Sequence, residues 1–180
     1  MISSLSRHAL PWINVALFQA AWLAIVLSAA YGQPWIAPIV TGAVLAWHLY
    51  HAHRPRRELA LIGIAIVVGA GFETLMASLQ VLEPASGILV PGFAAYWLVC
   101  LWAVFATTLN VSLRWLQPRP VLAAALGALG GPLAYVGGAK LGALHLESSY
   151  PSIGALAFGW ALATPLLLAT ARRLDGYARH

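Results

Sequence analysis

The sequence predicts an all-α integral membrane protein with six transmembrane helices. Hydrophobic residues make up 61% of its 180 residues and charged residues only 8%, and the mean hydropathy is +0.81. Soluble domains carry about 25% charged residues, so a soluble globule of this size could not cover its surface with so few charges. Disordered chains have low hydrophobicity, and the single cysteine, Cys100, excludes an intramolecular disulfide scaffold. We therefore expect one polytopic membrane domain over residues 1–180.

Prolines and charged residues divide the chain into apolar stretches, each near the 20 or so residues that a spanning helix needs. The first stretch exceeds the roughly 7–15 apolar residues of a signal peptide, so we expect it to be retained as a helix. The second is short, and its Pro38 lies in the first turn, where a missing N–H is tolerated. The six predicted spans are Leu10–Ala30, Trp35–His51, Leu59–Leu79, Phe93–Leu113, Val121–Leu141 and Ser152–Ala171.

The basic residues predict the orientation of these spans. With both termini in the cytoplasm, only Lys140 falls on the outer side, as the positive-inside rule requires. The net charge of +5 favours contact with anionic inner-leaflet phospholipid rather than nucleic acid. We expect a multi-pass protein of a bacterial inner membrane. The basic residues on the cytoplasmic side are Arg7, Arg54, Arg56, Arg57, Arg114, Arg119, Arg172, Arg173 and Arg179.

Polar residues near the inner ends of three predicted helices form the first candidate site. Polar groups inside a membrane are costly, so they face one another, water or a ligand. We therefore expect a cavity open to the inner leaflet between the first, second and fourth helices, with Arg54, Arg56 and Arg57 binding a lipid headgroup. The alternative is that Asn and Thr only join helices. The candidate lining residues are Asn14, Gln19, His48, His51, Thr107, Asn110 and Arg114.

The histidines of this group invite comparison with a metal site. Histidine-rich membrane di-iron enzymes need several such clusters together with carboxylates, and the histidines elsewhere in this chain are scattered. We therefore expect no metal site, and the sequence predicts no particular cofactor.

Glu73 is the second candidate site, because it lies deep within the third predicted helix. Small residues on its face, Gly69, Ala70 and Ala77, indicate packing against another helix rather than exposure to lipid. The acid could carry a proton, contact a substrate or hold the structure together. Lys140 is a candidate partner, although a lysine near a helix end can also extend to the lipid headgroups.

Glycines recur along one face of the fifth predicted helix, at Gly127, Gly131, Gly138 and Gly142. Such a face permits close helix packing. Pro132 interrupts the same helix, so the alternative is a gap that admits an acyl chain.

Three segments of the chain resemble an uncharacterised family of small six-helix bacterial inner-membrane proteins. They run from Asn14 to Trp22, from Leu101 to Asn110 and from Gly127 to Ala143. Members of that family are often encoded beside cyclopropane-fatty-acyl-phospholipid synthase. The resemblance implies a role around phospholipid acyl chains.

Three functions remain open. The first is a protein that acts on or binds phospholipid acyl chains, as a lipid-modification enzyme or an accessory subunit. The second is a transporter or flippase for a small molecule or lipid, coupled to protons through Glu73 and completed by a homo-oligomer. The third is a non-catalytic membrane scaffold for a soluble lipid-modifying enzyme. The sequence names neither a substrate nor a reaction.

Overall fold

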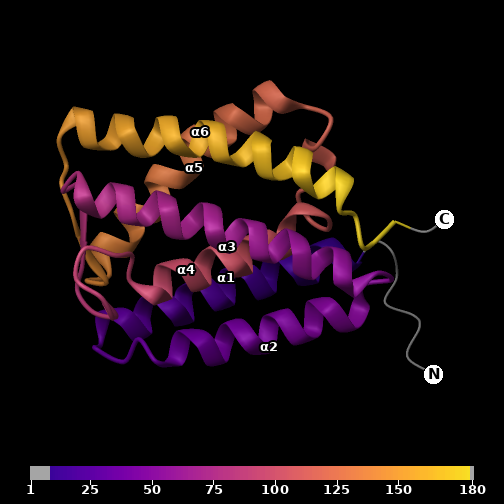
Figure 1. Cartoon of the computed structure of the whole chain (residues 1–180), viewed down its shortest axis with the longest axis horizontal. Coiled ribbons are helices and arrows are strands. Elements are labelled where there is room, and N and C mark those ends of the chain that lie inside the picture. Colours follow the sequence, from indigo (N-terminus) through magenta and orange to yellow (C-terminus); the bar gives the residue numbers. More distant parts are fainter. Residues whose placement is uncertain (1–8, 179–180) are drawn as a thin grey trace.

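The computed structural model describes residues 9–178, which form a bundle of six α-helices with a small two-stranded sheet at one end (Figure 1). Arg7 and Arg179, which contributed to the predicted orientation, lie outside the described residues. The helices are α1 (Ala9–Ala30), α2 (Ile36–His51), α3 (Pro55–Ser78), α4 (Tyr96–Leu109), α5 (Pro120–Lys140) and α6 (Tyr150–Arg173), and the strands are β1 (Leu82–Pro84) and β2 (Leu144–Leu146).

Successive helices run in opposite directions, so the bundle has two chemically different ends (Figure 1). We call the end where α2, α4 and α6 finish the basic end. Here lie Arg54, Arg56 and Arg57, the arginines of the α4–α5 connection, and Arg172 and Arg173 at the end of α6. We call the opposite end, which carries β1 and β2, the sheet end.

Four of the helices, α1, α3, α5 and α6, are long and apolar enough to cross a membrane. Large apolar side chains cover the outside of the bundle, including Val67, Val121, Leu133, Phe158 and Leu166. A soluble protein rarely exposes so many such groups together. The fold is therefore that of a membrane protein, with α2 and α4 shorter than the other four helices.

Helix α4 is shorter at both ends than the predicted span Phe93–Leu113. Its 14 residues rise about 21 Å, less than the hydrocarbon thickness of about 30 Å. Before the helix, the Ala94 N–H donates to Thr74 Oγ1 at 3.1 Å, which holds the preceding residues in a loop. After it, the Thr108 carbonyl accepts from the N–H groups of Val111 and Leu113, which closes the last turn.

The other helices agree with the predicted spans to within two residues, except at the start of α3. This helix begins at Pro55, four residues before the predicted Leu59, because proline is favoured in a first turn. The earlier start places Glu58 within the helix. The sequence did not predict the sheet. It joins the α3–α4 connection to the α5–α6 connection, and in it Leu82 lies opposite Leu146.

Close packing of α5 on α6 explains the glycines of α5. A Cβ at Gly131 would overlap the indole of Trp160, and one at Gly127 would overlap Thr164. Gly69 of α3 likewise gives room to Trp102 of α4. The short α4 lies inside the bundle, where it contacts α1, α2, α3 and α6.

Candidate functional sites

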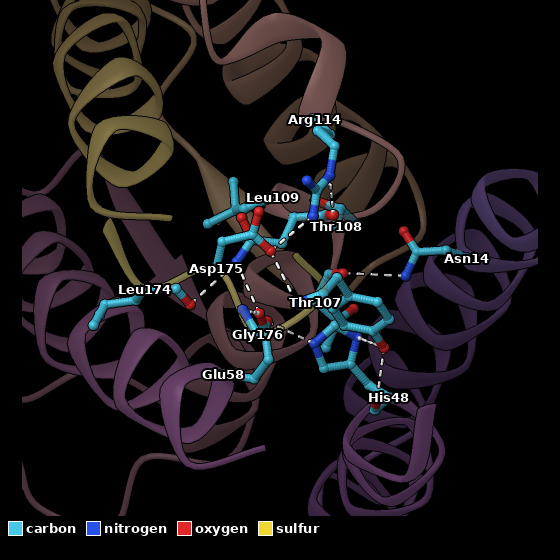
Figure 2. A network of polar contacts seen from close by, with 12 residues as sticks. Asn14, His48, Glu58, Thr107, Thr108, Leu109, Arg114, Leu174, Asp175 and Gly176 are labelled. Atoms are coloured by element: carbon cyan, nitrogen blue, oxygen red, sulfur yellow. Dashed lines mark hydrogen bonds and ion pairs between the residues drawn. The ribbon is translucent and has the colours of Figure 1, made fainter. Parts of the chain in front are cut away.

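Glu58 is the centre of a buried polar network at the basic end (Figure 2). Its Oε2 lies 2.9 Å from Nε2 of His48, and neither side chain is exposed at all. Its Oε1 accepts from Nδ2 of Asn110 at 2.8 Å and from the N–H of Gly176 at 2.7 Å. Both carboxyl oxygens are thereby satisfied, so the charge is buried with partners rather than without them.

The segment after α6 completes this network. The Tyr177 hydroxyl donates to the His48 carbonyl at 2.6 Å and lies 3.2 Å from His48 Nδ1. Burial raises the pKa of Tyr177 well above its ordinary value, and the nearby charge of Glu58 raises it further. A neutral Tyr177 hydroxyl therefore belongs to the folded state.

Further hydrogen bonds connect the network to α1 and to the α4–α5 connection. Asn14 donates to the Thr107 carbonyl at 3.2 Å and accepts from the Ser112 hydroxyl at 2.6 Å. Arg114 donates to Asp175 at 2.7 Å, and Gln117 donates to Asn110 Oδ1 at 2.9 Å. We call this set the basic-end network; it consists of Asn14, His48, Glu58, Thr107, Asn110, Ser112, Arg114, Gln117, Asp175, Gly176 and Tyr177.

The structure brings together five of the seven residues predicted to line an inner cavity: Asn14, His48, Thr107, Asn110 and Arg114. They bond one another and the segment after α6. None of the seven lines the cavity described below.

The other two predicted lining residues lie apart from the network. His51 Nδ1 bonds the Trp47 carbonyl of its own helix at 2.8 Å, and Gln19 is exposed on α1. Of the predicted headgroup residues, Arg56 and Arg57 are exposed, whereas the Arg54 N–H donates to the Gly176 carbonyl at 2.9 Å.

Sequence reasoning missed the residues that tie the network together, chiefly Glu58, Asp175 and Tyr177. Glu58 stands three residues after Pro55, and an acid in a first turn after proline is a usable signal for the start of a helix. The docking of residues 174–178 has no comparable signal, because this short polar segment has no periodic pattern.

A second site surrounds Glu73 in the half of the bundle nearer the sheet end. Here a cavity of about 80 Å³ is lined by residues of α1, α3, α4, α5, α6 and β2. Half of the lining residues are aromatic, and Glu73 is the only charged residue among them. The lining consists of Phe18, Trp22, Val26, Glu73, Trp97, Leu98, Leu101, Trp102, Phe105, Ala134, Tyr135, Gly138, Leu144 and Trp160.

One oxygen of Glu73 is bonded and the other is not. Oε1 accepts from Trp102 Nε1 at 2.8 Å and from the Tyr135 hydroxyl. Oε2 has no hydrogen-bond partner, although Glu73 is only 1% exposed. Lys140 is exposed at the end of α5, and Trp102 and Tyr135 bond Glu73 in place of that expected partner.

Helix α4 contacts α1, α2, α3 and α6, so its remaining side faces α5 across the cavity. The partly exposed lining residues are Phe18 and Trp22 on α1, Leu101 and Phe105 on α4, Ala134 on α5 and Trp160 on α6.

The two sites differ in the chemistry they can support. The basic-end network has internal partners for its buried groups, as a structural network does. The Glu73 cavity offers apolar walls and one incomplete polar group, as binding pockets do. Within residues 9–178, no three His, Cys, Asp or Glu side chains gather in a way that could hold a metal ion.

Comparison with known proteins identifies one related family. A family model described as "Protein of unknown function (DUF2878)" matches residues 11–166, which include all three segments of the expected resemblance. No curated protein and no solved structure matches the chain.

Proposed function

Because the chain belongs to the DUF2878 family, whose function is unknown, we propose its function from the cavity around Glu73. We propose that the protein binds the acyl chain of a membrane lipid there, either to modify the chain or to present it to a lipid-modifying enzyme. The observation that carries this proposal is an aromatic-lined cavity with one buried acid whose Oε2 has no partner.

The surroundings of the cavity support an acyl ligand. A chain that leaves the bilayer gains little hydrophobic free energy, because lipid tails are as apolar as the protein interior. Affinity must therefore come from close packing against rings such as Trp22 and Phe105 and from one polar contact at Glu73. A water-soluble ligand would instead need several polar groups, and the lining offers few.

For the orientation, we propose six spans, with the short α2 and α4 supported by the four longer helices. The basic end faces the cytoplasm of a bacterial cell, where exposed Arg56 and Arg57 attract anionic headgroups at about 1 kcal/mol per residue. The cavity then lies in the outer half of the membrane.

A cavity-filling substitution tests the proposal. Gly138 lines the cavity, and a Cβ there would lie 3.7 Å from Leu144 Cδ2, an ordinary van der Waals contact. In Gly138→Leu the new side chain occupies the space of the ligand without a backbone clash. We expect full-length wild-type protein to retain one lipid or fatty acid per chain in native mass spectrometry, and Gly138→Leu to lose it.

The matched control is Gly130→Leu on the same helix, where a Cβ meets no atom within 4 Å. It should retain the ligand as the wild type does. Equal retention by Gly138→Leu and wild type would overturn the proposal. Comparing the membrane lipids of a strain lacking the gene with those of its parent tests both roles together, because loss of the modifying protein or of the presenting protein should change the chains.

Transport is the second candidate, favoured by the position of Glu73 inside a membrane-spanning helix, where acids often carry protons. In proteoliposomes, uptake of a labelled fatty acid should then respond to a pH gradient in wild type and lose that response in Glu73→Gln. Uptake that ignores the gradient in both would exclude it.

A further inference from the structure

We infer that the polar group recognised inside the Glu73 cavity is a hydroxyl carried by an otherwise apolar chain. The inference rests on the proposed function, since it names the class of ligand for the same cavity. It starts from two buried polar atoms that the protein leaves without hydrogen bonds.

The first of these atoms is Oε2 of Glu73 and the second is Nε1 of Trp160. Both residues line the same cavity. The Trp160 indole interacts with the side chain of Tyr135 but completes no hydrogen bond. Buried polar atoms in native proteins are nearly always bonded, and we assign one ligand group as the partner of both atoms because both residues line the same cavity.

The two atoms have complementary roles. The indole N–H of Trp160 can only donate. Oε1 of Glu73 receives two donated hydrogen bonds, from Trp102 and Tyr135, and in the ionised carboxylate Oε2 likewise only accepts. A partner for both atoms must therefore donate one hydrogen bond and accept another.

A hydroxyl group meets both demands, because it has one donor and two acceptor positions. An ether or ketone accepts but cannot donate to Glu73. A protonated amine donates but cannot accept from Trp160, and a carboxylate accepts only. A water molecule has the same pattern as a hydroxyl, so the experiment must separate the two.

The depth of the site places this hydroxyl within a hydrocarbon chain rather than at a headgroup. Glu73 lies inside α3, a helix long and apolar enough to cross the membrane, more than a turn before its end at Ser78. The remaining walls are apolar or aromatic, and they suit the methylene groups on either side of the hydroxyl.

Three matched probes test the inference on the full-length protein in detergent by titration calorimetry. They are octadecanoate with a mid-chain hydroxyl, octadecanoate with a mid-chain methoxy group, and unsubstituted octadecanoate. We expect the hydroxyl probe to bind about tenfold more tightly than the methoxy probe, because only the hydroxyl donates to Glu73. The unsubstituted chain should bind most weakly.

Two variants assign the preference to the two atoms. Trp160→Phe removes the indole N–H donor, so the methoxy probe should no longer bind more tightly than the unsubstituted chain. Trp12→Phe, which changes an exposed tryptophan, is the control. In Glu73→Gln the amide oxygen keeps the bonds from Trp102 and Tyr135, which places an N–H₂ donor at the former Oε2. That variant should bind the hydroxyl and methoxy probes equally.

The outcomes separate this inference from the proposed function. One outcome would support the proposed function but overturn the hydroxyl inference. In it, wild type binds all three probes equally and Gly138→Leu binds none of them. The cavity would then bind acyl chains, and water alone would bond Glu73 Oε2 and Trp160 Nε1. Failure of every probe to bind overturns both proposals. Adding octadecanol distinguishes the ligand sources: a preference for it indicates a free long-chain alcohol, whereas a preference for the mid-chain hydroxyl indicates a hydroxylated acyl chain.

Discussion

Glu58 and Glu73 belong to the same helix, and both are buried, at 0% and 1% exposure, yet their surroundings are opposite. Glu58 has partners on both oxygens, drawn from α2, the end of α4 and the segment after α6. Glu73 has partners on one oxygen only, beside a cavity. The protein satisfies both oxygens of Glu58 by itself, whereas it leaves Oε2 of Glu73 without a hydrogen-bond partner.

The largest expected effect is on stability at Glu58. Glu58→Ala leaves His48, Asn110 and the Gly176 N–H without their buried partner. The free energy of unfolding should fall by about 3–5 kcal/mol, the usual loss when one member of a buried ion pair is removed. Reversible unfolding in mixed micelles measures it, with exposed Glu147→Ala as a control that should change little. A loss below about 1 kcal/mol would mean that the network does not hold the basic end together.

The closure of the network by the segment after α6 depends on Gly176. A Cβ there would lie 2.6 Å from Glu58 Cγ and 2.7 Å from the Arg54 carbonyl oxygen. Gly176→Ala should therefore lower the free energy of unfolding by about 1–3 kcal/mol. Gly154→Ala, whose Cβ meets open space, should not lower it. Equal stability of the two variants in the same assay would show that this segment is not closely packed.

Tyr177 gives the basic end a dependence on alkaline pH. Its pKa is raised in the folded state, so the unfolded state loses the hydroxyl proton first as the pH rises. This contribution is fully present below the ordinary tyrosine pKa of 10.0 and is lost above it. Tyr177→Phe should cost about 1 kcal/mol at neutral pH and flatten the decline above pH 10. Unfolding measured across that range checks this, and exposed Tyr50→Phe should keep the wild-type decline.

The ion pair of Arg114 with Asp175 should contribute less, because 43% of the Arg114 side chain is exposed. Arg114→Met is expected to lower the free energy of unfolding by about 0.2–1 kcal/mol. Part of this difference should disappear in high salt, which screens exposed charges. A difference that is large and independent of salt would place this arginine within the core of the network instead.

The smallest stability change is expected at Glu73. In Glu73→Gln the amide oxygen can accept both hydrogen bonds of Oε1, and no bond is lost at Oε2. The free energy of unfolding should change by less than about 0.5 kcal/mol. Glu58→Gln is the matched substitution and should cost more, because its amide group faces donors on both sides. Equal losses from the two variants would erase the contrast between the sites.

Much of the fold follows from the sequence, because the apolar stretches and their breaks depend on local composition. The predicted start of α3 was late because Pro55 and the neighbouring arginines indicated a break between helices. The predicted ends of α4 were too long because apolar residues 93–95 continue the hydrophobic pattern while the backbone leaves the helix. Its loop depends on a distant partner, Thr74 of α3, which no local pattern reveals.

The sites were predictable only in part, for the same reason. Glu73 could be recognised because a buried acid is costly wherever it lies in a spanning helix. Its partners Trp102 and Tyr135 come from other helices and read as ordinary aromatic residues until the bundle is assembled. His48 and Asn110 were grouped by depth as lining residues of a cavity, but depth does not reveal that both side chains bond Glu58 and that Tyr177 bonds His48.

The hydrogen bond from the Gly176 N–H to Glu58 joins residues 118 positions apart, and this separation orders events during synthesis. Chains emerge from the ribosome N-terminus first. Helix α3 therefore exists, with Glu58 near its start, long before residue 176 has been made. His48 is available at once and Asn110 arrives with α4, but the third partner comes only after all six helices. The basic-end network consequently closes only after residue 176 has been synthesised.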